Sequence, residues 1–284
     1  MSTCYLNGRY LPLEQAQISV LDRGFLFGDG VYEVLPSFGG RLFRLEQHLQ
    51  RLDNSLAAVR MGNPLSQAQW SEVINEVLEH NGGGDQSIYL QVTRGIAKRD
   101  HVLPEPVAQT VLVMSMPVVR HNQEPVSAMT CEDFRWKLCQ VKSIALLANV
   151  LMRMQAHDHG AYEAILIRDG RLTEGAASNV FVVNDGVIKT PPHSAYLLPG
   201  VTRDLIVELL RDSGLPFAET EVPEAEVLAA EEIWITSSNR EIVPVTMLNG
   251  KPVGAGVAGP LWSKVLAIYE TFRDTHIVGG AQAA

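Results

Sequence analysis

Residues 163–190 read EAILIRDGRLTEGAASNVFVVNDGVIKT and contain two strand–turn–strand patterns in succession. In each pattern, an apolar run leads into an Asp-Gly pair, at Asp169-Gly170 and at Asp185-Gly186, and a second run follows. Asp-Gly is a preferred sequence for the two-residue turns of β-hairpins, because both positions tolerate positive φ. The segment therefore predicts a domain with much antiparallel sheet. The expected strands are 163–168, 171–173, 179–183 and 187–190.

Helical periodicity occurs in both halves of the chain. Apolar residues recur at three- and four-residue steps over 45–59 and 70–78, which predicts two amphipathic helices. The second of these is expected to end at Asn81-Gly82. Further helices are expected over 144–155 and 202–211.

Shorter segments add strands to this pattern. An Asn7-Gly8 turn predicts a hairpin over 4–11. Residues 88–92 alternate between apolar and polar, 110–116 form a buried type of apolar run, and 232–236 form a further strand. The chain is therefore expected to be α+β.

A polar stretch that contains a proline, residues 118–125, separates the two halves. We expect an N-terminal α/β domain over 1–117, an interdomain linker over 118–125 and a C-terminal domain over 126–284.

The composition argues against several classes of function. With 46% hydrophobic and 19% charged residues, the 284-residue chain has enough apolar material for packed cores. Its 32 acidic and 23 basic side chains give a net charge of −9, which disfavours nucleic acid and anionic membranes as partners. The sequence has no phosphate-binding P-loop, serine nucleophile elbow, dinucleotide fingerprint or zinc-binding His pair, and no metal is expected.

Cysteine usage and the N-terminal sequence favour a cytoplasmic protein. The three cysteines are an odd number without C-x-x-C spacing, which is typical of a reducing compartment. The first ten residues lack a basic stretch followed by an apolar one. The longest apolar run, 143–152, is shorter than the roughly 20 residues that a membrane-spanning helix needs.

Among the six lysines, Lys142 has the most unusual surroundings, because it leads into an apolar helical segment. Burial there would depress the pKa of the amine and make it a nucleophile able to form an imine. The alternative is a solvated lysine whose stem covers apolar surface.

Two further segments are candidates for ligand binding. In the first, Leu198 to Thr202 forms a glycine turn into a helix whose first amides are free to bind a phosphate. The alternative is an ordinary helix start capped by Thr202. In the second, Glu174 lies at a strand end among small residues that let a flat ligand approach the backbone, although glutamate in a tight turn is also common.

Taken in order and spacing, these segments resemble the fold-type IV pyridoxal-phosphate enzymes over nearly the whole chain. That family includes D-amino acid aminotransferases, branched-chain L-amino acid aminotransferases, aminodeoxychorismate lyases and R-selective amine transaminases. The resemblance implies a smaller N-terminal α/β domain, a larger C-terminal domain of antiparallel barrel-like strands plus helices, and a homodimer. The segments that carry it are 22–33 (DRGFLFGDGVYE), 48–52 (HLQRL), 141–143 (VKS), 173–179 (TEGAASN), 200–203 (GVTR) and 236–238 (TSS).

The resemblance also implies a role for particular residues toward pyridoxal phosphate. Lys142 would hold the cofactor as a Schiff base and shuttle the proton between the substrate α-carbon and the cofactor C4′. Glu174 would pair with the pyridine nitrogen and keep it protonated. The remaining cofactor-binding residues would be Arg51, Val201, Thr202, Ser237 and Ser238, with Leu198 against the ring face. On helical spacing alone, Arg51 would instead lie on a solvated helix face.

Arg99 and His101 form an R-x-H pattern that resembles the one by which D-amino acid aminotransferases bind the substrate carboxylate, together with a pocket tyrosine, here Tyr32. Arginine supplies paired donors to a planar carboxylate, and histidine adds a third. The alternative is that 98–100 is simply a charged loop tip, and Tyr32 a half-buried strand aromatic.

We therefore expect a transaminase that works between a D-amino acid, D-alanine-like or acidic, and a 2-oxo acid such as 2-oxoglutarate or pyruvate, ping-pong through pyridoxamine phosphate. The alternatives are a branched-chain L-aminotransferase, then an aminodeoxychorismate lyase, and, from another class, a non-catalytic cofactor-binding protein. Ala176, Ala177 and Pro36 depart from the family pattern near the pocket, so the side-chain preference stays open.

Overall fold

The computed structural model describes residues 2–102, 107–118 and 123–279. The chain forms two compact units. One comprises Met1–Val119 with Val141–Ala145, and the other comprises Arg120–Gln140 with Leu146–Ala284. The division falls inside the expected linker 118–125, of which residues 119–122 lie outside the described part of the chain. The domain boundaries expected from the sequence stay a prediction.

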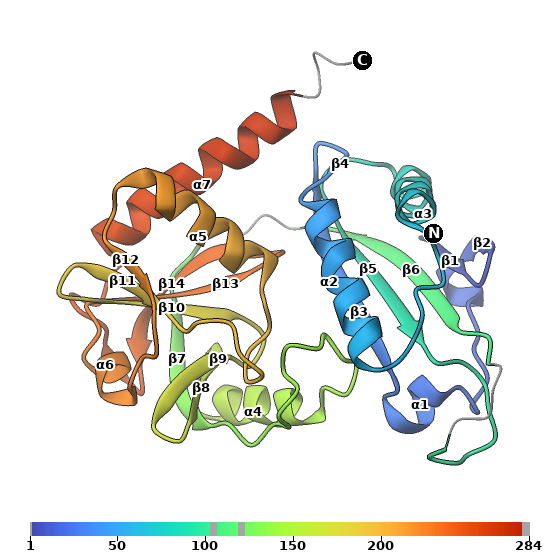
Figure 1. Cartoon of the computed structure of the whole chain (residues 1–284). Helices are drawn as coiled ribbons and strands as arrows, with labels where there is room; N and C mark the ends of the chain where they lie inside the picture. The colour runs from blue at the N-terminus through green and yellow to red at the C-terminus, as the bar shows by residue number, and fades with distance from the viewer. Residues whose placement is uncertain (1, 103–106, 119–122, 280–284) are drawn as a thin grey trace. The chain divides into compact units, whose positions relative to one another are not determined.

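The first unit is built on an antiparallel sheet of six described strands in the order β2-β1-β6-β5-β3-β4. Helices α2 and α3 pack against this sheet (Figure 1). Their apolar faces, including Leu52, Trp70 and Ile74, join Leu35 and Leu90 of the sheet in one core. The elements are β1 (Thr3–Leu6), β2 (Arg9–Pro12), a 3-10 turn (Leu13–Gln15), α1 (Arg23–Phe27), β3 (Gly30–Phe38), β4 (Arg41–Leu42), α2 (Leu45–Ala58), α3 (Gln67–His80), β5 (Gln86–Thr93) and β6 (Thr110–Pro117).

The second unit is built on a mixed sheet of nine described strands, with β12-β11-β10-β13-β14-β7-β8-β9 in order and β15 beside β14. The two Asp-Gly hairpins are antiparallel, whereas β7 pairs in parallel with both β8 and β14. The elements are β7 (Val126–Glu132), α4 (Leu147–Asp158), β8 (Glu163–Arg168), β9 (Arg171–Gly175), β10 (Asn179–Asn184), β11 (Val187–Thr190), α5 (Val201–Ser213), β12 (Phe217–Glu219), α6 (Glu224–Leu228), β13 (Glu232–Ser237), β14 (Glu241–Leu248), β15 (Lys251–Pro252) and α7 (Pro260–Gly279).

Most local predictions are confirmed. The N-terminal hairpin, both early helices, the strands at 88–92, 110–116 and 232–236, and the two central hairpins are all present. The turn pairs have positive φ as expected, for example +50° at Asp169 and +72° at Gly170. Strands β7 and β14 and helices α6 and α7 were not predicted.

One helix begins later than its sequence suggested. The expected helix over 144–155 starts only at Leu147. Ser143 instead forms an isolated bridge with Val31, and the Ile144 amide donates to the Gly30 carbonyl. Residues 141–145 therefore pack with the first unit as an extended segment before the chain enters α4. No helix in the described part of the chain is long and apolar enough to cross a membrane.

Candidate active site

Lys142 is held by its backbone in the first unit. Its amide donates to Ser55 Oγ at 3.2 Å, and its carbonyl accepts from the Tyr32 amide at 2.9 Å. The side chain is partly exposed rather than buried, and Nζ lies 4.2 Å from the centre of the Tyr32 ring. A cation over an aromatic face is attracted by the ring quadrupole, so Tyr32 orients the amine. The structure thus brings Lys142 and Tyr32 together.

Arg51 lies on the buried face of α2, and the alternative of a solvated helix face is wrong for it. Its Nε and Nη2 donate to the two carboxylate oxygens of Glu33, at 2.7 and 2.8 Å. His48 Nδ1 lies 2.8 Å from the same carboxylate. Burial alone would raise the pKa of Glu33, but the Arg51 charge and the hydrogen bonds from Arg51 and His48 lower it to about 2. Glu33 is therefore ionised and fixes the direction of the guanidinium.

His48 shares the buried carboxylate of Glu33 with Arg51. Burial lowers the pKa of its imidazole, and the charges of Arg51 and Lys142 lower it further against the opposing effect of Glu33. We refer to Lys142, Tyr32, Glu33, His48 and Arg51 as the Lys142 set.

Arg99 and His101 both lie against the ring of Phe27 in the first unit. The guanidinium carbon of Arg99 is 5.4 Å from the ring centre, and the His101 ring is 5.5 Å from it. Both side chains are exposed, and Arg23 holds the backbone between them through the Asp100 carbonyl. The structure therefore brings Arg99 and His101 together on Phe27, while Tyr32 lies against Lys142 and Tyr89.

Glu174 lies one residue before the end of β9 in the second unit, with both carboxylate oxygens engaged. Oε1 accepts from Arg135 Nη1 at 2.5 Å. Oε2 accepts from Asn179 Nδ2 at 3.2 Å and from the Leu198 amide at 3.0 Å. The Asn179 side chain also donates to the Leu198 carbonyl at 2.9 Å, which joins the segment before α5 to the strand end that carries Glu174.

The start of α5 provides amide donors for a ligand. Its N-cap is Gly200, and no side chain of the described residues caps the first amides, so the alternative in which Thr202 caps the helix is wrong. A Cβ at position 200 would collide with Asn179 Oδ1, so a glycine is required for this close approach. Val201 and Thr202 open the helix and are buried.

The end of β13 adds hydroxyl groups beside this helix start. Thr236 pairs with Asn179 in the sheet, and its buried hydroxyl has no hydrogen-bond partner among the described residues. Ser237 and Ser238 follow and are partly exposed. We refer to Glu174, Asn179, Leu198, the 200–202 turn and 236–238 as the Glu174 set. An orphaned buried hydroxyl beside free helix amides is what a site for a phosphorylated ligand would show.

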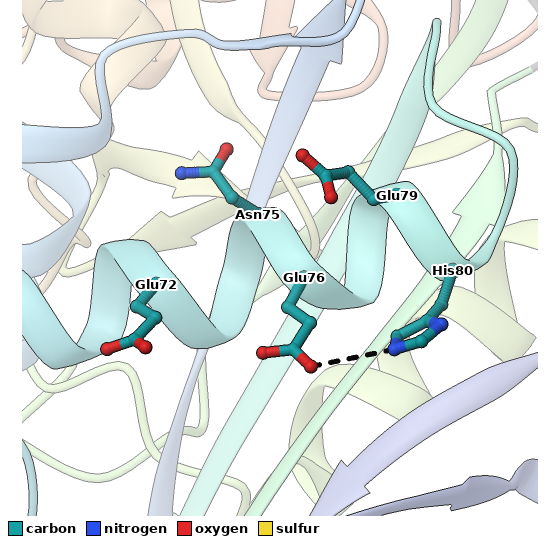
Figure 2. Close-up of a pocket in the computed structure, with 5 residues that line it drawn as sticks. All are labelled: Glu72, Asn75, Glu76, Glu79 and His80. Carbon is teal, nitrogen blue, oxygen red and sulfur yellow. Dashed lines mark ion pairs between the residues drawn. The ribbon is translucent and has the colours of Figure 1, made fainter.

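These groups fit pyridoxal phosphate chemically. An amine suits its aldehyde, a charged carboxylate suits its ring nitrogen, and helix amides with hydroxyls suit its phosphate. The hollow lined by α3 does not fit an anionic cofactor (Figure 2), because acidic side chains dominate its roughly 510 Å³. It is lined by Glu72, Asn75, Glu76, Glu79 and His80. The described residues contain no cluster of three or more metal-binding side chains.

Several residues that support these sets were not predicted from the sequence, namely Glu33, His48, Arg135 and Asn179. Glu33 had a readable signal. It alternates with Val31 and Leu35 and so shares their core-facing side of β3, where a charge requires a buried partner. Arg135 carried no such local signal.

Comparison with known proteins agrees with this chemistry. Residues 30–248 match the profile of the class IV aminotransferases, and the chain belongs to that family. It is a pyridoxal-phosphate-dependent aminotransferase of fold type IV, which confirms the class, fold and cofactor expected from its motifs.

Two sequence relatives and one solved structure show which members of the family this chain is similar to. The chain is 39% identical to a D-alanine aminotransferase of Bacillus licheniformis, over 91% of this chain and 93% of that protein. It is 33% identical to a D-alanine aminotransferase of Staphylococcus aureus (strain COL), over 98% and 100%. Among solved structures, a branched-chain amino acid aminotransferase from Escherichia coli has a TM-score of 0.87 and 26% identity, over 93% and 92%.

Proposed function

We propose that this protein transfers the amino group of a D-amino acid, D-alanine-like or acidic, to a 2-oxo acid such as 2-oxoglutarate or pyruvate. The observation that carries the proposal is the similarity, 39% and 33% over nearly the whole chain, to two D-alanine aminotransferases. The joint placement of Arg99 and His101 on Phe27 supports the proposal, because one loop then presents several N–H donors that can bind a substrate carboxylate.

The Lys142 set and the Glu174 set would each bind part of pyridoxal phosphate. When bound, the cofactor supplies an electron sink for the bond broken at the substrate α-carbon. Lys142 Nζ would take the proton from the substrate α-carbon and deliver it to the cofactor C4′, with the Tyr32 ring keeping the amine in place. Glu174 would place a negative charge opposite the ring nitrogen, and Leu198 would pack against the ring face.

The phosphate would be bound by the Val201 and Thr202 amides with the hydroxyls of Ser237 and Ser238. Arg51 of the first unit would add a guanidinium for the phosphate. Because Glu33 holds two of its nitrogens, Arg51 enters the site with a fixed direction instead of a freely rotating side chain.

The substrate carboxylate would be bound by Arg99, His101 and Tyr32. The exposure of Arg99 and His101 supports a homodimer in which their loop serves a second copy of the chain. Exposed apolar side chains at helical spacing on α4 also support self-association. These are Leu147, Val150, Leu151 and Met154. Mass photometry at nanomolar concentration should show a dimer, and a fully active monomer would contradict this part of the proposal.

We infer a cytoplasmic location from the cysteine usage and the N-terminal sequence. The support is that Cys4, Cys131 and Cys139 are all free and buried. Cell fractionation of the native host would test it.

Anaerobic titration of the cofactor-loaded protein tests the function. D-alanine should bleach the cofactor absorption band, and L-leucine should leave it unchanged. Bleaching by L-leucine alone would overturn the D-amino acid proposal in favour of the branched-chain alternative. The solved branched-chain aminotransferase of Escherichia coli has the same fold as this chain. No bleaching by any amine donor would overturn transamination itself.

A further inference from the structure

A buried arginine outside the expected site residues contacts Glu174. Arg135 lies between β7 and α4, and its side chain is 6% exposed. Its Nη1 donates to Glu174 Oε1, while Nε and Nη2 donate to the two oxygens of Asp133, both at 2.9 Å. We propose that Arg135 is a positioning residue that keeps Glu174 ionised and aimed at the cofactor's ring nitrogen. This inference rests on the role proposed above for Glu174.

Asp133 anchors the arginine. Its carboxylate is fully buried and also pairs with Arg168 at 3.0 Å and accepts from the Thr173 hydroxyl at 3.0 Å. Burial would raise the pKa of Asp133, but hydrogen bonds and charge from Arg135 lower it below its ordinary value. Thr173 directly precedes Glu174, so one carboxylate holds both the arginine and the strand that carries the glutamate.

Hydrogen bonds to several partners fix the Arg135 side chain. Its Nη2 also donates to the Tyr196 carbonyl at 3.1 Å. Burial acts against its charge, yet the hydrogen bonds to Asp133 and the charge of Glu174 raise the pKa of the guanidinium above its ordinary value. Arg135 is therefore always positively charged and has a fixed orientation. Its third partner, after Asp133 and Tyr196, is Glu174.

The consequence for Glu174 follows from its burial. A buried carboxylate without a positive partner favours its neutral form, which would not stabilise a protonated ring nitrogen. The neutral donors Asn179 and the Leu198 amide both reach Oε2, so Arg135 supplies the positive charge at Oε1. Without it, the carboxyl would lose both its charge and the orientation of one oxygen.

A double-mutant cycle with Arg135→Met and Glu174→Gln tests the proposal. The direct readout is the ¹⁵N chemical shift of ring-labelled pyridoxal phosphate bound to each variant, beside kcat and KM for D-alanine. Arg135→Met should move the shift toward the unprotonated nitrogen and lower kcat by about 10- to 100-fold, with KM nearly unchanged. The double variant should be no more than about threefold slower than Glu174→Gln, because both changes remove the same interaction.

Arg273→Met is the matched control. Arg273 on α7 lies in the same unit, has Nη1 2.8 Å from each carboxylate oxygen of Glu241, and also pairs with Glu270 and Asp274. It should lower stability without moving the ¹⁵N shift. Arg135→Lys covers the case in which Arg135→Met does not fold, because it keeps the charge. It should give a ¹⁵N shift between those of the native protein and Glu174→Gln.

The outcomes separate this inference from the proposed function. A native ¹⁵N shift in the Arg135 variants, or losses in kcat that multiply in the double variant, would overturn the positioning role. A native shift and rate in Glu174→Gln would instead overturn the role of Glu174 on which the inference rests.

Discussion

Replacing Glu33 with glutamine should destabilise the first unit by about 3.5 kcal/mol at pH 7. The side chain is fully buried, and its pKa falls from an ordinary 4.5 to about 2, a difference of 4.5 − 2 = 2.5 pKa units, worth about 3.5 kcal/mol at about 1.4 kcal/mol per unit. Removing one partner of a buried ion pair costs about 3–5 kcal/mol of stability, which agrees with this value. Arg51 would then lie buried beside a neutral amide.

The pH dependence has a definite sign. Because the folded pKa of Glu33 is lowered, its contribution is complete above pH 4.5 and is lost as the pH falls through about 2. The difference between the native protein and Glu33→Gln should therefore shrink to about half by pH 3.

Urea unfolding of the apoprotein at several pH values measures the difference, with hydrogen exchange of peptides from β3 and α2 to report on the first unit. The matched control is Glu76→Gln, which removes an exposed pair with His80 and should change stability by less than about 0.5 kcal/mol. A cost below about 1 kcal/mol for Glu33→Gln at pH 7, or a difference that does not shrink at pH 3, would refute the reasoning.

Three further substitutions test the assigned roles. Lys142→Ala should fold normally but lose D-alanine transamination by at least about 10²- to 10⁴-fold in a coupled pyruvate assay, and full turnover without added amine would contradict its role. Gly200→Ala should weaken cofactor binding by about tenfold or more, because its Cβ would collide with Asn179; Gly62→Ala, which points into open space, should bind normally in the same titration. Arg99→Lys should raise KM for D-alanine by about 10- to 100-fold without changing cofactor affinity, and an unchanged KM would remove it from the carboxylate site.

The local signals in the sequence predicted most of the elements correctly. The Asp-Gly hairpins are present because their turns depend on the φ preference of two adjacent residues, such as Asp185 and Gly186. Helices α2 and α3 could be predicted because each carries one apolar stripe, and such a stripe indicates a helix that covers a sheet.

The sequence failed where the partner of a segment is distant along the chain. Strand β7 pairs in parallel with β8 and β14, and such pairing leaves no turn signature between the strands. The late start of α4 has the same cause, because Ser143 and Ile144 bond to β3 more than 100 residues earlier instead of starting a helix.

The sequence by itself determined the class of chemistry, because Lys142, Glu174 and the 200–202 turn occur in an ordered pattern that needs no coordinates. Only the tertiary structure decided how the charges are held. Arg51 reaches Glu33, and Arg135 reaches Glu174, across 18 and 39 positions of sequence. Buried charges are stable only with partners, and the fold alone determines which distant residues meet.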